Sequence, residues 1–477
     1  MTTSTTFHNP YYEENLYGPA KDELFVEQLK VIEGKVPADI YGAYIRNGPN
    51  PKHEPKGRYH WFDGDGMLHG VYFNEGKVSY RNRYIQTKAF QHEAIEGRAI
   101  WTGLLENKKN NPFFEKEKNT SNTDVIFHNG NLLTLWYRAG QPYKVDARTL
   151  ETIGVEDFGG KLTCNISAHS KVDEQTGEFI FFDYGNTYPY MMYGVATANG
   201  QLTHCVPIEL PGPRLPHDMA ITKNYSILMD LPLFNDPEAA KLGYYKSKFF
   251  RELPSRFGII PRYGGAEDIK WFEASPCYIY HVVNAWEEGD EIVMVCCRVK
   301  EPEPPESKDD GPLERMLAFL RLDAQMHCWR FNMKTGATKE YGLCDYNTEF
   351  PVMNLDYTGI KSRYSYNVCI TNGRTLEFDG VAKYDTWTGD SIRYEFGPGR
   401  FGTEGAYAPR ENATSEDDGY LITYVYDQNT DSSELVILDA KQFDLGPIAR
   451  LEIPQRIPMG FHATWINGEK LYAETQV

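Results

Sequence analysis

The chain has 477 residues, and its 67 Asp and Glu against 49 Lys and Arg give a formal net charge of −18. This acidity argues against nucleic acid as the main partner, because neutralising phosphates requires clustered Lys and Arg. Hydrophobic residues make up 41% and charged residues 24%, a balance that excludes a disordered chain. Aromatic residues reach 14%, and Tyr and Phe favour pleated, half-buried surfaces. A large β protein is therefore the leading class.

The N-terminal segment has neither a basic start nor an apolar core, so no secretory signal is predicted. No window approaches the roughly 18 apolar residues of a transmembrane helix. The eight cysteines form no CxxC pair, which disfavours both a zinc site and a dense disulfide framework. We expect a cytoplasmic protein with free thiols, and weak peripheral membrane contact is the alternative if its substrate is apolar.

Short apolar runs alternate with turn signals along most of the chain. Residues 131–155 predict strand, turn and strand, with a second turn opening at Asp146 and Ala147. Residues 171–183 predict a turn at 175–177 with a strand after it. This alternation is typical of antiparallel hairpins.

The same pattern continues toward the C-terminus. Asn199-Gly200 predicts a hairpin turn within residues 190–208. Residues 331–336 and 384–389 predict one turn that is used twice. Further hairpins are predicted at 276–300, 317–342, 381–396 and 419–452. These spacings favour four-stranded units around an axis, as in a β-propeller, and the pattern alone leaves a pair of β-sandwiches open.

Two segments depart from the strand pattern. Residues 236–252 predict a helix, with Asp236 as its cap and Pro237 in its first turn. This helix either packs on the β-structure or forms a membrane-surface or substrate-entry element. Residues 301–312 predict a charged, proline-rich surface loop.

Four of the twelve histidines, His169, His217, His281 and His462, lie near apolar, strand-like runs. Inner strands from different propeller blades converge on the axis, so these side chains could share one metal ion. An all-imidazole set suits iron, copper, nickel or zinc better than magnesium or calcium. For each histidine by itself, a hydrogen-bonded core role is the alternative.

Two glutamates lie in apolar settings that suit support of metal ligands. Ligating imidazoles usually donate their second N–H to a carboxylate or carbonyl. Glu349 in Thr348-Glu349-Phe350 and Glu404 in Thr403-Glu404-Gly405 are candidates for this role. The alternative for each is a solvated carboxylate at a strand end.

Six motifs in a fixed order resemble the carotenoid cleavage oxygenase family over nearly all of the chain. They are Arg46-Asn47-Gly48-Pro49-Asn50-Pro51, Trp61-Phe62-Asp63-Gly64-Asp65-Gly66-Met67, Ala168-His169-Ser170-Lys171-Val172-Asp173, Pro216-His217-Asp218-Met219-Ala220, residues 280–289 and His462. The resemblance implies an all-β, seven-bladed β-propeller with a cap of loops and short helices, formed by residues 1–477 as a single domain. It also implies Fe2+ held by His169, His217, His281 and His462.

The resemblance assigns the supporting carboxylates as well. Glu349 is expected behind His281, and Glu404 behind His462. A third glutamate of the family should follow the tryptophan of a Leu-Trp-Glu segment and orient His217. This chain has Leu135-Trp136-Tyr137-Arg138 there, so a water, a hydroxyl or a backbone carbonyl is left to orient His217.

The activity implied is cleavage of a conjugated carbon–carbon double bond by O2, which gives aldehyde or ketone products. Phe62, Trp136 and Phe350 are candidate walls of an apolar tunnel, and plain core packing is their alternative role. The phenolic branch of the family holds its substrate with a tyrosine and a lysine, which fall here at Leu104 or Leu105 and at Trp136. A carotenoid or apocarotenoid is therefore expected. The alternatives are a stilbenoid or phenylpropenoid alkene, and a non-catalytic propeller scaffold; the oligomeric state is left open.

Overall fold

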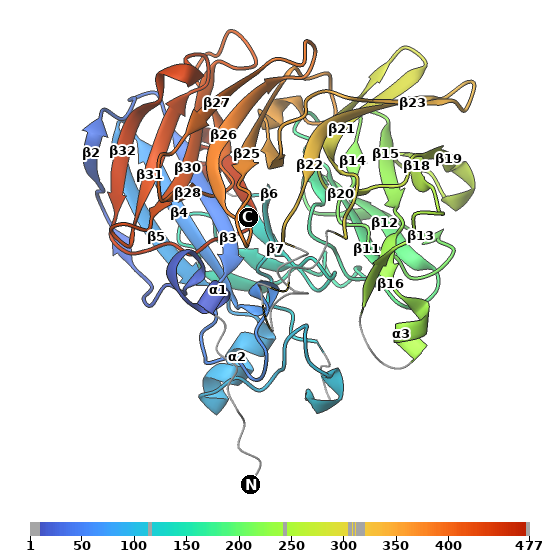
Figure 1. Cartoon of the computed structure of the whole chain (residues 1–477), viewed down its shortest axis with the longest axis horizontal. Helices are drawn as coiled ribbons and strands as arrows, with labels where there is room; N and C mark the ends of the chain where they lie inside the picture. The colour runs from blue at the N-terminus through green and yellow to red at the C-terminus, as the bar shows by residue number, and fades with distance from the viewer. Residues whose placement is uncertain are drawn as a thin grey trace. The chain divides into compact units, whose positions relative to one another are not determined.

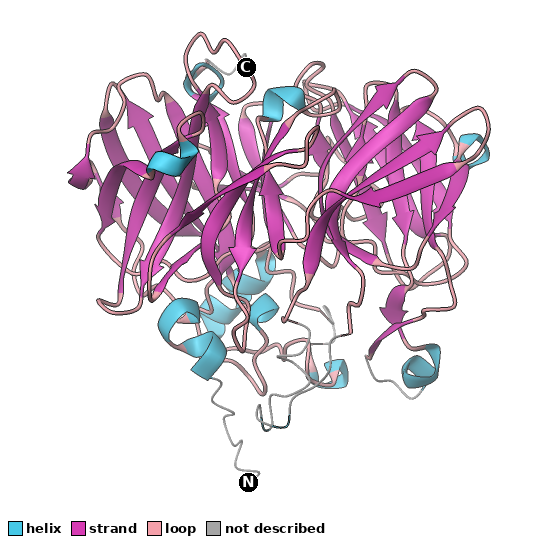
Figure 2. Ribbon diagram, turned by 45° about the horizontal axis from the view of Figure 1, so that its top comes forward, coloured by secondary structure: helices cyan, strands magenta, loops and turns pink. Residues whose placement is uncertain are grey.

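The computed structural model describes residues 10–112, 117–241, 246–303, 308, 311 and 320–473. Strands dominate, and the helices are few and short (Figure 2). The described helices are α1 (Pro10–Glu13), α2 (Lys88–Glu96), α3 (Pro237–Lys241) and α5 (Gly468–Tyr472), with 3-10 turns that include η2 (Trp61–Asp63) and η3 (Lys108–Asn110). Within the described ranges, none of the helices has the length and apolarity that crossing a bilayer requires.

The chain divides into two compact units. The first contains residues 1–157, 398–413 and 418–477, and the second contains residues 158–397 and 414–417. Each unit is built from antiparallel sheets whose strands mostly follow one another in sequence. Local hairpins thus supply most of the pairing, in agreement with the turn signals of the sequence.

The first unit contains three sheets. The first sheet has, from edge to edge, β1 (Phe25–Val26), β5 (Lys77–Tyr84), β4 (Gly66–Asn74), β3 (Gly42–Pro49) and β33 (Ala463–Asn467). The second has β6 (Asp124–His128), β7 (Asn131–Leu135), β8 (Tyr143–Val145) and β9 (Thr152–Val155). The third has β2 (Lys30–Gly34), β32 (Pro447–Ile453), β31 (Ser432–Asp439), β30 (Gly419–Asp427) and β28 (Arg400–Gly402), with β29 (Ala406–Pro409) also on β30 (Figure 1).

The second unit contains four four-stranded sheets and a two-stranded ribbon. One sheet has β10 (Lys171–Val172), β11 (Phe179–Tyr184), β12 (Tyr190–Ala196) and β13 (Leu202–Glu209). A second sheet has β14 (Ala220–Ile221), β15 (Tyr225–Asp230), β18 (Ser255–Pro261) and β19 (Lys270–Ala274). A third sheet has β20 (Tyr278–Glu288), β21 (Glu291–Val299), β22 (Ala324–Asn332) and β23 (Thr338–Gly342). A fourth has β24 (Thr348–Val352), β25 (Tyr364–Ile370), β26 (Phe378–Asp385) and β27 (Ser391–Glu395). The ribbon pairs β16 (Leu233–Asn235) with β17 (Ser247–Phe249).

The predicted turns are confirmed, including the turn that is used twice. In the first copy, Asn332 Oδ1 accepts the backbone N–H of Lys334 at 3.1 Å and of Thr335 at 2.8 Å. In the second, Asp385 Oδ1 accepts the corresponding N–H groups of the residues two and three positions on. Each turn closes on a glycine in the left-handed region, with φ of 77° at position 336 and 82° at position 389. A side-chain acceptor followed by glycine therefore encodes this connection.

The helix predicted over 236–252 is wrong from residue 246 onward, and residues 242–245 lie outside the described residues. Its start is confirmed, because Asp236 Oδ1 accepts the N–H of Glu238 at 3.1 Å and Pro237 opens α3. The chain then enters β17, where Phe249 is buried and Lys248 is exposed. This period-two burial and the pairing with β16 overrode the helical pattern. Most of the loop predicted at 301–312 lies outside the described residues.

Candidate metal centre

Three of the four predicted histidines come together in the second unit. The ring centroids of His169 and His217 are 4.7 Å apart, those of His169 and His281 are 4.9 Å apart, and those of His217 and His281 are 5.3 Å apart. The nitrogen atoms that His169 and His281 can offer to a metal lie within 4.8 Å of each other. His169 and His281 are buried, and His217 is half-buried. Imidazoles at this spacing can share one first-row transition metal.

The three rings lie at or just before the first strands of three successive sheets. His169 lies just before β10, His217 lies just before β14, and His281 lies on β20 at an irregularity in its pairing with β21. The backbone of His169 is left-handed, with φ of 64°. This conformation costs a residue with a side chain about 1–2 kcal/mol, and such strain is concentrated at functional sites. The left-handed backbone at His169 therefore sets the direction of its ring.

A buried carboxylate holds His281. Glu349 on β24 has no exposed surface, and one of its carboxylate oxygens contacts His281 Nδ1 and also accepts the N–H of Phe350. With Nδ1 turned to the carboxylate, Nε2 is the ring nitrogen that can bind a metal. The pairing of Glu349 with His281 expected from sequence is confirmed.

The first unit repeats this arrangement at His462. Glu404 Oε1 lies 3.1 Å from His462 Nδ1, and Glu404 Oε2 accepts the N–H of Ala463 at 2.5 Å. His462 and Glu404 are both buried, and burial raises the pKa of Glu404 against the opposing effect of His462. The pairing of Glu404 with His462 expected from sequence is also confirmed.

The Arg46-Asn47-Gly48 motif supports the segment that carries His462. The Asn47 backbone N–H donates to His462 O at 2.8 Å, and Asn47 O accepts the N–H of Phe461 at 3.0 Å. The Asn47 side-chain amide donates to Ser121 O and Asp124 O at 2.8 and 3.0 Å. The sequence alone indicated no role for this motif, because its long-range contacts exist only in the folded chain.

Asp218 is a second residue whose role the sequence did not reveal. Its Oδ1 accepts Lys171 Nζ and the N–H of Met219, both at 2.7 Å, and its Oδ2 accepts the N–H of Val282 at 2.7 Å. These donors flank His169, His217 and His281 in the chain. The buried Asp218 carboxylate therefore ties the three histidine-bearing segments of the second unit together.

Residues 137 and 138, where the family resemblance places a glutamate, make contacts of their own in the first unit. The Tyr137 N–H donates to Thr123 Oγ1 at 3.1 Å, and Arg138 forms two hydrogen bonds to Glu117. In the second unit, the His217 ring lies edge-on to Tyr280 at 5.2 Å. A carboxylate next to His217 in sequence, that of Asp218, fixes the backbone around it.

Aromatic rings lie next to two of the predicted ligands. In the second unit, the Phe350 ring is 4.7 Å from that of His281. In the first unit, Phe62 packs 5.0 Å from Phe461, which precedes His462, and 4.9 Å from Tyr137. A pocket of about 360 Å³, partly open to solvent, is lined by residues that include Phe62, Leu104, Lys108, Trp136, Tyr137 and Arg138.

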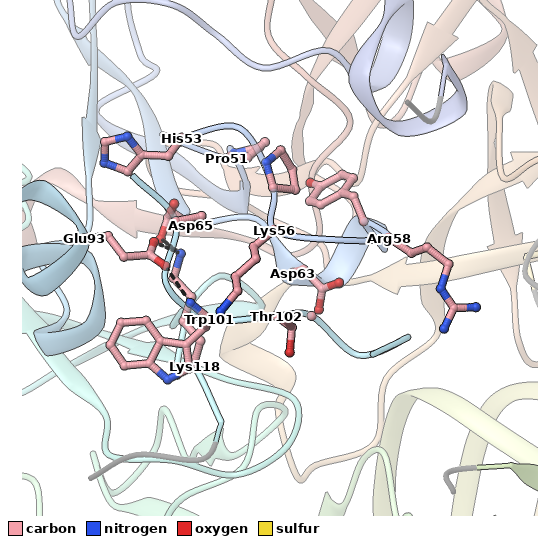
Figure 3. Close-up of a pocket in the computed structure, with 14 residues that line it drawn as sticks. Pro51, His53, Lys56, Arg58, Asp63, Asp65, Glu93, Trp101, Thr102 and Lys118 are labelled. Carbon is pink, nitrogen blue, oxygen red and sulfur yellow. Dashed lines mark hydrogen bonds and ion pairs between the residues drawn. The ribbon is translucent and has the colours of Figure 1, made fainter. Parts of the chain in front are cut away.

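A neighbouring polar pocket of about 420 Å³, open mouth included, is drawn in Figure 3. Lys118 Nζ lies 2.6 Å from Asp65 Oδ1 and 2.7 Å from Glu93 Oε2, and both carboxylates are buried. Glu93 belongs to α2, and Asp65 precedes β4. Asp63 accepts the N–H groups of His60 and Leu104 at 2.9 Å each. The Asp63-Gly64-Asp65-Gly66 run therefore connects the segments that contain Glu93, Leu104 and Lys118 in the first unit.

Comparison with known proteins agrees with this geometry. The family model described as retinal pigment epithelial membrane protein (RPE65) matches residues 17–467. A carotenoid 9,10(9',10')-cleavage dioxygenase from Crocus sativus is 37% identical over 497 aligned residues, which cover 97% of this chain and 90% of the relative. The chain belongs to the carotenoid cleavage oxygenase family.

Solved structures establish the architecture of this family member. Pseudomonas brassicacearum lignostilbene dioxygenase matches with a TM-score of 0.87 and 30% identity, covering 96% of this chain and 99% of that one. Cobalt-substituted Synechocystis apocarotenoid oxygenase matches with a TM-score of 0.83 and 26% identity, covering 94% and 97%. The predicted seven-bladed β-propeller is confirmed, and the chain is an alkene-cleaving dioxygenase, an oxidoreductase.

Replacing Asp218 should weaken metal binding without unfolding the protein. Asp218→Asn removes the ion pair with Lys171 and one of the acceptor oxygens, so the histidine segments lose their common anchor. By analogy with other residues that orient metal ligands, we expect Co2+ affinity to fall about 10–100-fold by calorimetric titration. Asp230→Asn is the matched control, because Asp230 is a buried aspartate that pairs with Arg214 and Arg256. Equal Co2+ affinity in the two variants would contradict the role of Asp218.

Asp63 should make stability depend on pH between about 4 and 6. Burial raises the pKa of Asp63 from 3.8 to about 6, so this group favours the folded state less as the pH rises through that window. Asp63→Asn removes this dependence. The free energy of unfolding of the variant, relative to that of the unsubstituted protein, should therefore increase from pH 4 to pH 7. Denaturant unfolding at several pH values measures the trend, with the exposed Asp444→Asn as control. A difference in stability that stays constant with pH would contradict the assignment.

Proposed function

We propose that the protein uses O2 to cleave a conjugated double bond of a carotenoid or apocarotenoid, giving two carbonyl products. The observation that carries this proposal is the cluster of His169, His217 and His281, whose ring centroids lie 4.7–5.3 Å apart. We assign His462 as the fourth ligand because a buried glutamate holds its Nδ1 as one holds that of His281. The relative named as a carotenoid 9,10(9',10')-cleavage dioxygenase makes that bond the first to test.

The donor set fits Fe2+, the ion we propose. Neutral imidazoles suit divalent first-row metals, and buried carboxylates on Nδ1 raise the basicity of their rings. Glu349 and Glu404 also contribute negative charge, which is costly in a buried site unless a cation offsets it. Bound there, the ion would supply the one-electron chemistry that lets O2 react with an alkene.

The chain's own residues position the ligands and exclude water. Glu349 and Glu404 fix the tautomers of His281 and His462 through Nδ1. Asp218 holds the backbone next to His217 and His281, and its ion pair with Lys171 reaches the segment of His169. The Phe350 ring, 4.7 Å from that of His281, provides apolar surface for a polyene, so that one double bond can be placed repeatedly in the same position.

A stilbenoid or phenylpropenoid alkene is the second candidate substrate. The pocket lined by Leu104 and Trp136 also contains Lys108 and Arg138, which could contact a phenolic oxygen. Burial and Arg138 lower the pKa of Lys108 to about 8. Leu104 and Trp136 themselves offer no polar group of the kind the phenolic branch uses, and we therefore rank the polyene first.

We further propose that residues 1–477 act as a single domain, since one family model spans residues 17–467. All eight cysteines are free, which suits a reducing compartment such as the cytoplasm. Weak peripheral contact with the membrane that dissolves a polyene is part of this proposal.

A panel of alkenes distinguishes the two substrate classes. The iron-loaded protein should convert apocarotenoids or carotenoids to aldehydes under 18O2, with labelled products identified by mass spectrometry. Hydroxystilbenes serve as the parallel set. Labelled aldehydes from the stilbenes alone would overturn the substrate assignment but leave the dioxygenase intact.

His281→Ala should abolish iron retention and lower the rate of cleavage by at least about 100-fold, because it removes a ligand. His204→Ala is the matched control, since His204 lies in the same unit and bonds Gly264 O at 3.0 Å. Iron content by elemental analysis and initial rates measure both effects. A non-catalytic scaffold predicts no difference between the variants, so full iron content and activity in His281→Ala would refute the proposed site.

A further inference from the structure

Two thiols meet in the second unit, and one of them, Cys164, lies on the segment that leads to His169. Cys164 and Cys205 have their Sγ atoms 3.8 Å apart. Both are half-buried, whereas Cys277, Cys296, Cys297, Cys328 and Cys369 are buried. The pair thus combines proximity with access to small molecules in solution, the two conditions for thiol–disulfide exchange.

The backbone around each cysteine permits the sulfurs to approach. Cys205 lies on β13, the last strand of its sheet, where it pairs with Gly194 of β12. Cys164 follows the exposed Gly159 and Gly160, both in the left-handed region with φ of 70° and 77°. A disulfide needs an S–S distance of about 2.05 Å. The loop that precedes Cys164 can supply the remaining shift.

The contact also makes the two thiols chemically unequal. A hydrogen bond from the Cys164 thiol lowers the pKa of Cys205, and the same bond raises the pKa of Cys164. The thiolate is the reactive form of cysteine. We therefore expect Cys205 to attack an oxidant and Cys164 to resolve the adduct.

The chain beyond Cys164 is firmly attached up to the metal-site histidine. The Asn165 N–H donates to Asp183 Oδ2 at 3.0 Å, and the Ser167 N–H donates to Phe182 O at 2.9 Å. His169 follows two residues later. A disulfide at Cys164 would thus fix the end of the segment 164–169 that lies next to the exposed Gly159 and Gly160.

We propose that Cys164 and Cys205 form a reversible disulfide with a low-molecular-weight disulfide such as oxidised glutathione as the oxidant, and that this bond restrains the segment leading to His169. The Cys205 thiolate attacks one glutathione sulfur and releases one glutathione thiolate. Cys164 then loses its proton, attacks the Cys205 sulfur and releases the second glutathione. In sum, two protein thiols are oxidised to one disulfide, and one oxidised glutathione is reduced to two glutathiones. Disulfides in reducing compartments are usually of this transient, redox-sensing kind.

The test treats the full-length protein with oxidised glutathione and maps peptides by mass spectrometry. We expect a Cys164–Cys205 cross-link with loss of two hydrogen atoms, reversed by dithiothreitol, and a Tm higher by about 2–4 °C because the cross-link constrains the unfolded chain. Cys164→Ser should trap Cys205 as a glutathione adduct, and Cys205→Ser should trap far less at Cys164. Cys344→Ser, at the third half-buried cysteine, is the control and should leave the cross-link unchanged.

Hydrogen exchange of the amides of residues 161–168 tests the second half of the proposal, because exchange should slow in the oxidised protein. These measurements require neither metal nor substrate, so their outcome is independent of the proposed dioxygenase reaction. Separate glutathione adducts on Cys164 and Cys205 without a cross-link would overturn the disulfide. A cross-link that leaves the exchange rates unchanged would overturn the restraint on the His169 segment.

Discussion

Buried carboxylates are the constraint on which the candidate site depends. Glu349, Glu404 and Asp218 are 0%, 5% and 2% exposed, and each lies against a histidine-bearing segment. Removing an ionised carboxylate from water is costly unless hydrogen bonds and opposite charge compensate. Asp218 is compensated by Lys171 and two backbone N–H groups, all at 2.7 Å. Glu349 and Glu404 each accept one backbone N–H and face an imidazole, and a metal ion on the far side of those rings would supply the remaining compensation.

The β-structure makes such a site possible because its first strands bring distant parts of the sequence together. The first strands β14 and β20 lie beside each other, and β20 lies beside β24. Departures from regular pairing occur at the functional positions. Register shifts occur next to His281 and Glu349, and left-handed backbone occurs at His169 and Phe350. Regular pairing over most of these sheets holds the irregular residues in place, which is how a fold retains local strain.

The sequence predicted what local chemistry encodes. Turns at Asn199-Gly200 and at Asn332 and Asp385 follow from side-chain acceptors and glycines, and the structure has them where expected. The histidines and their glutamates stood out because they lie in ordered motifs. The role of Asp218 could not be predicted, because its partners Lys171 and Val282 are 47 and 64 residues away in the chain. The strand at Ser247–Phe249 was mistaken for helix for the same reason, since its identity is set by pairing with β16.

The net charge of the chain and the character of its interior are separate properties. A charge of −18 describes the whole molecule, while the Phe350 ring that lies 4.7 Å from His281 and the Phe461 side chain that precedes His462 in sequence are apolar. The acidic side chains that support the histidines enter the interior singly, each engaged with donors. The imidazoles of His281 and His462 therefore separate their glutamates from the side on which a metal ion would bind. The carboxylates act on the chemistry only through the rings they hold, which separates the electrostatic support of the metal from the recognition of the alkene.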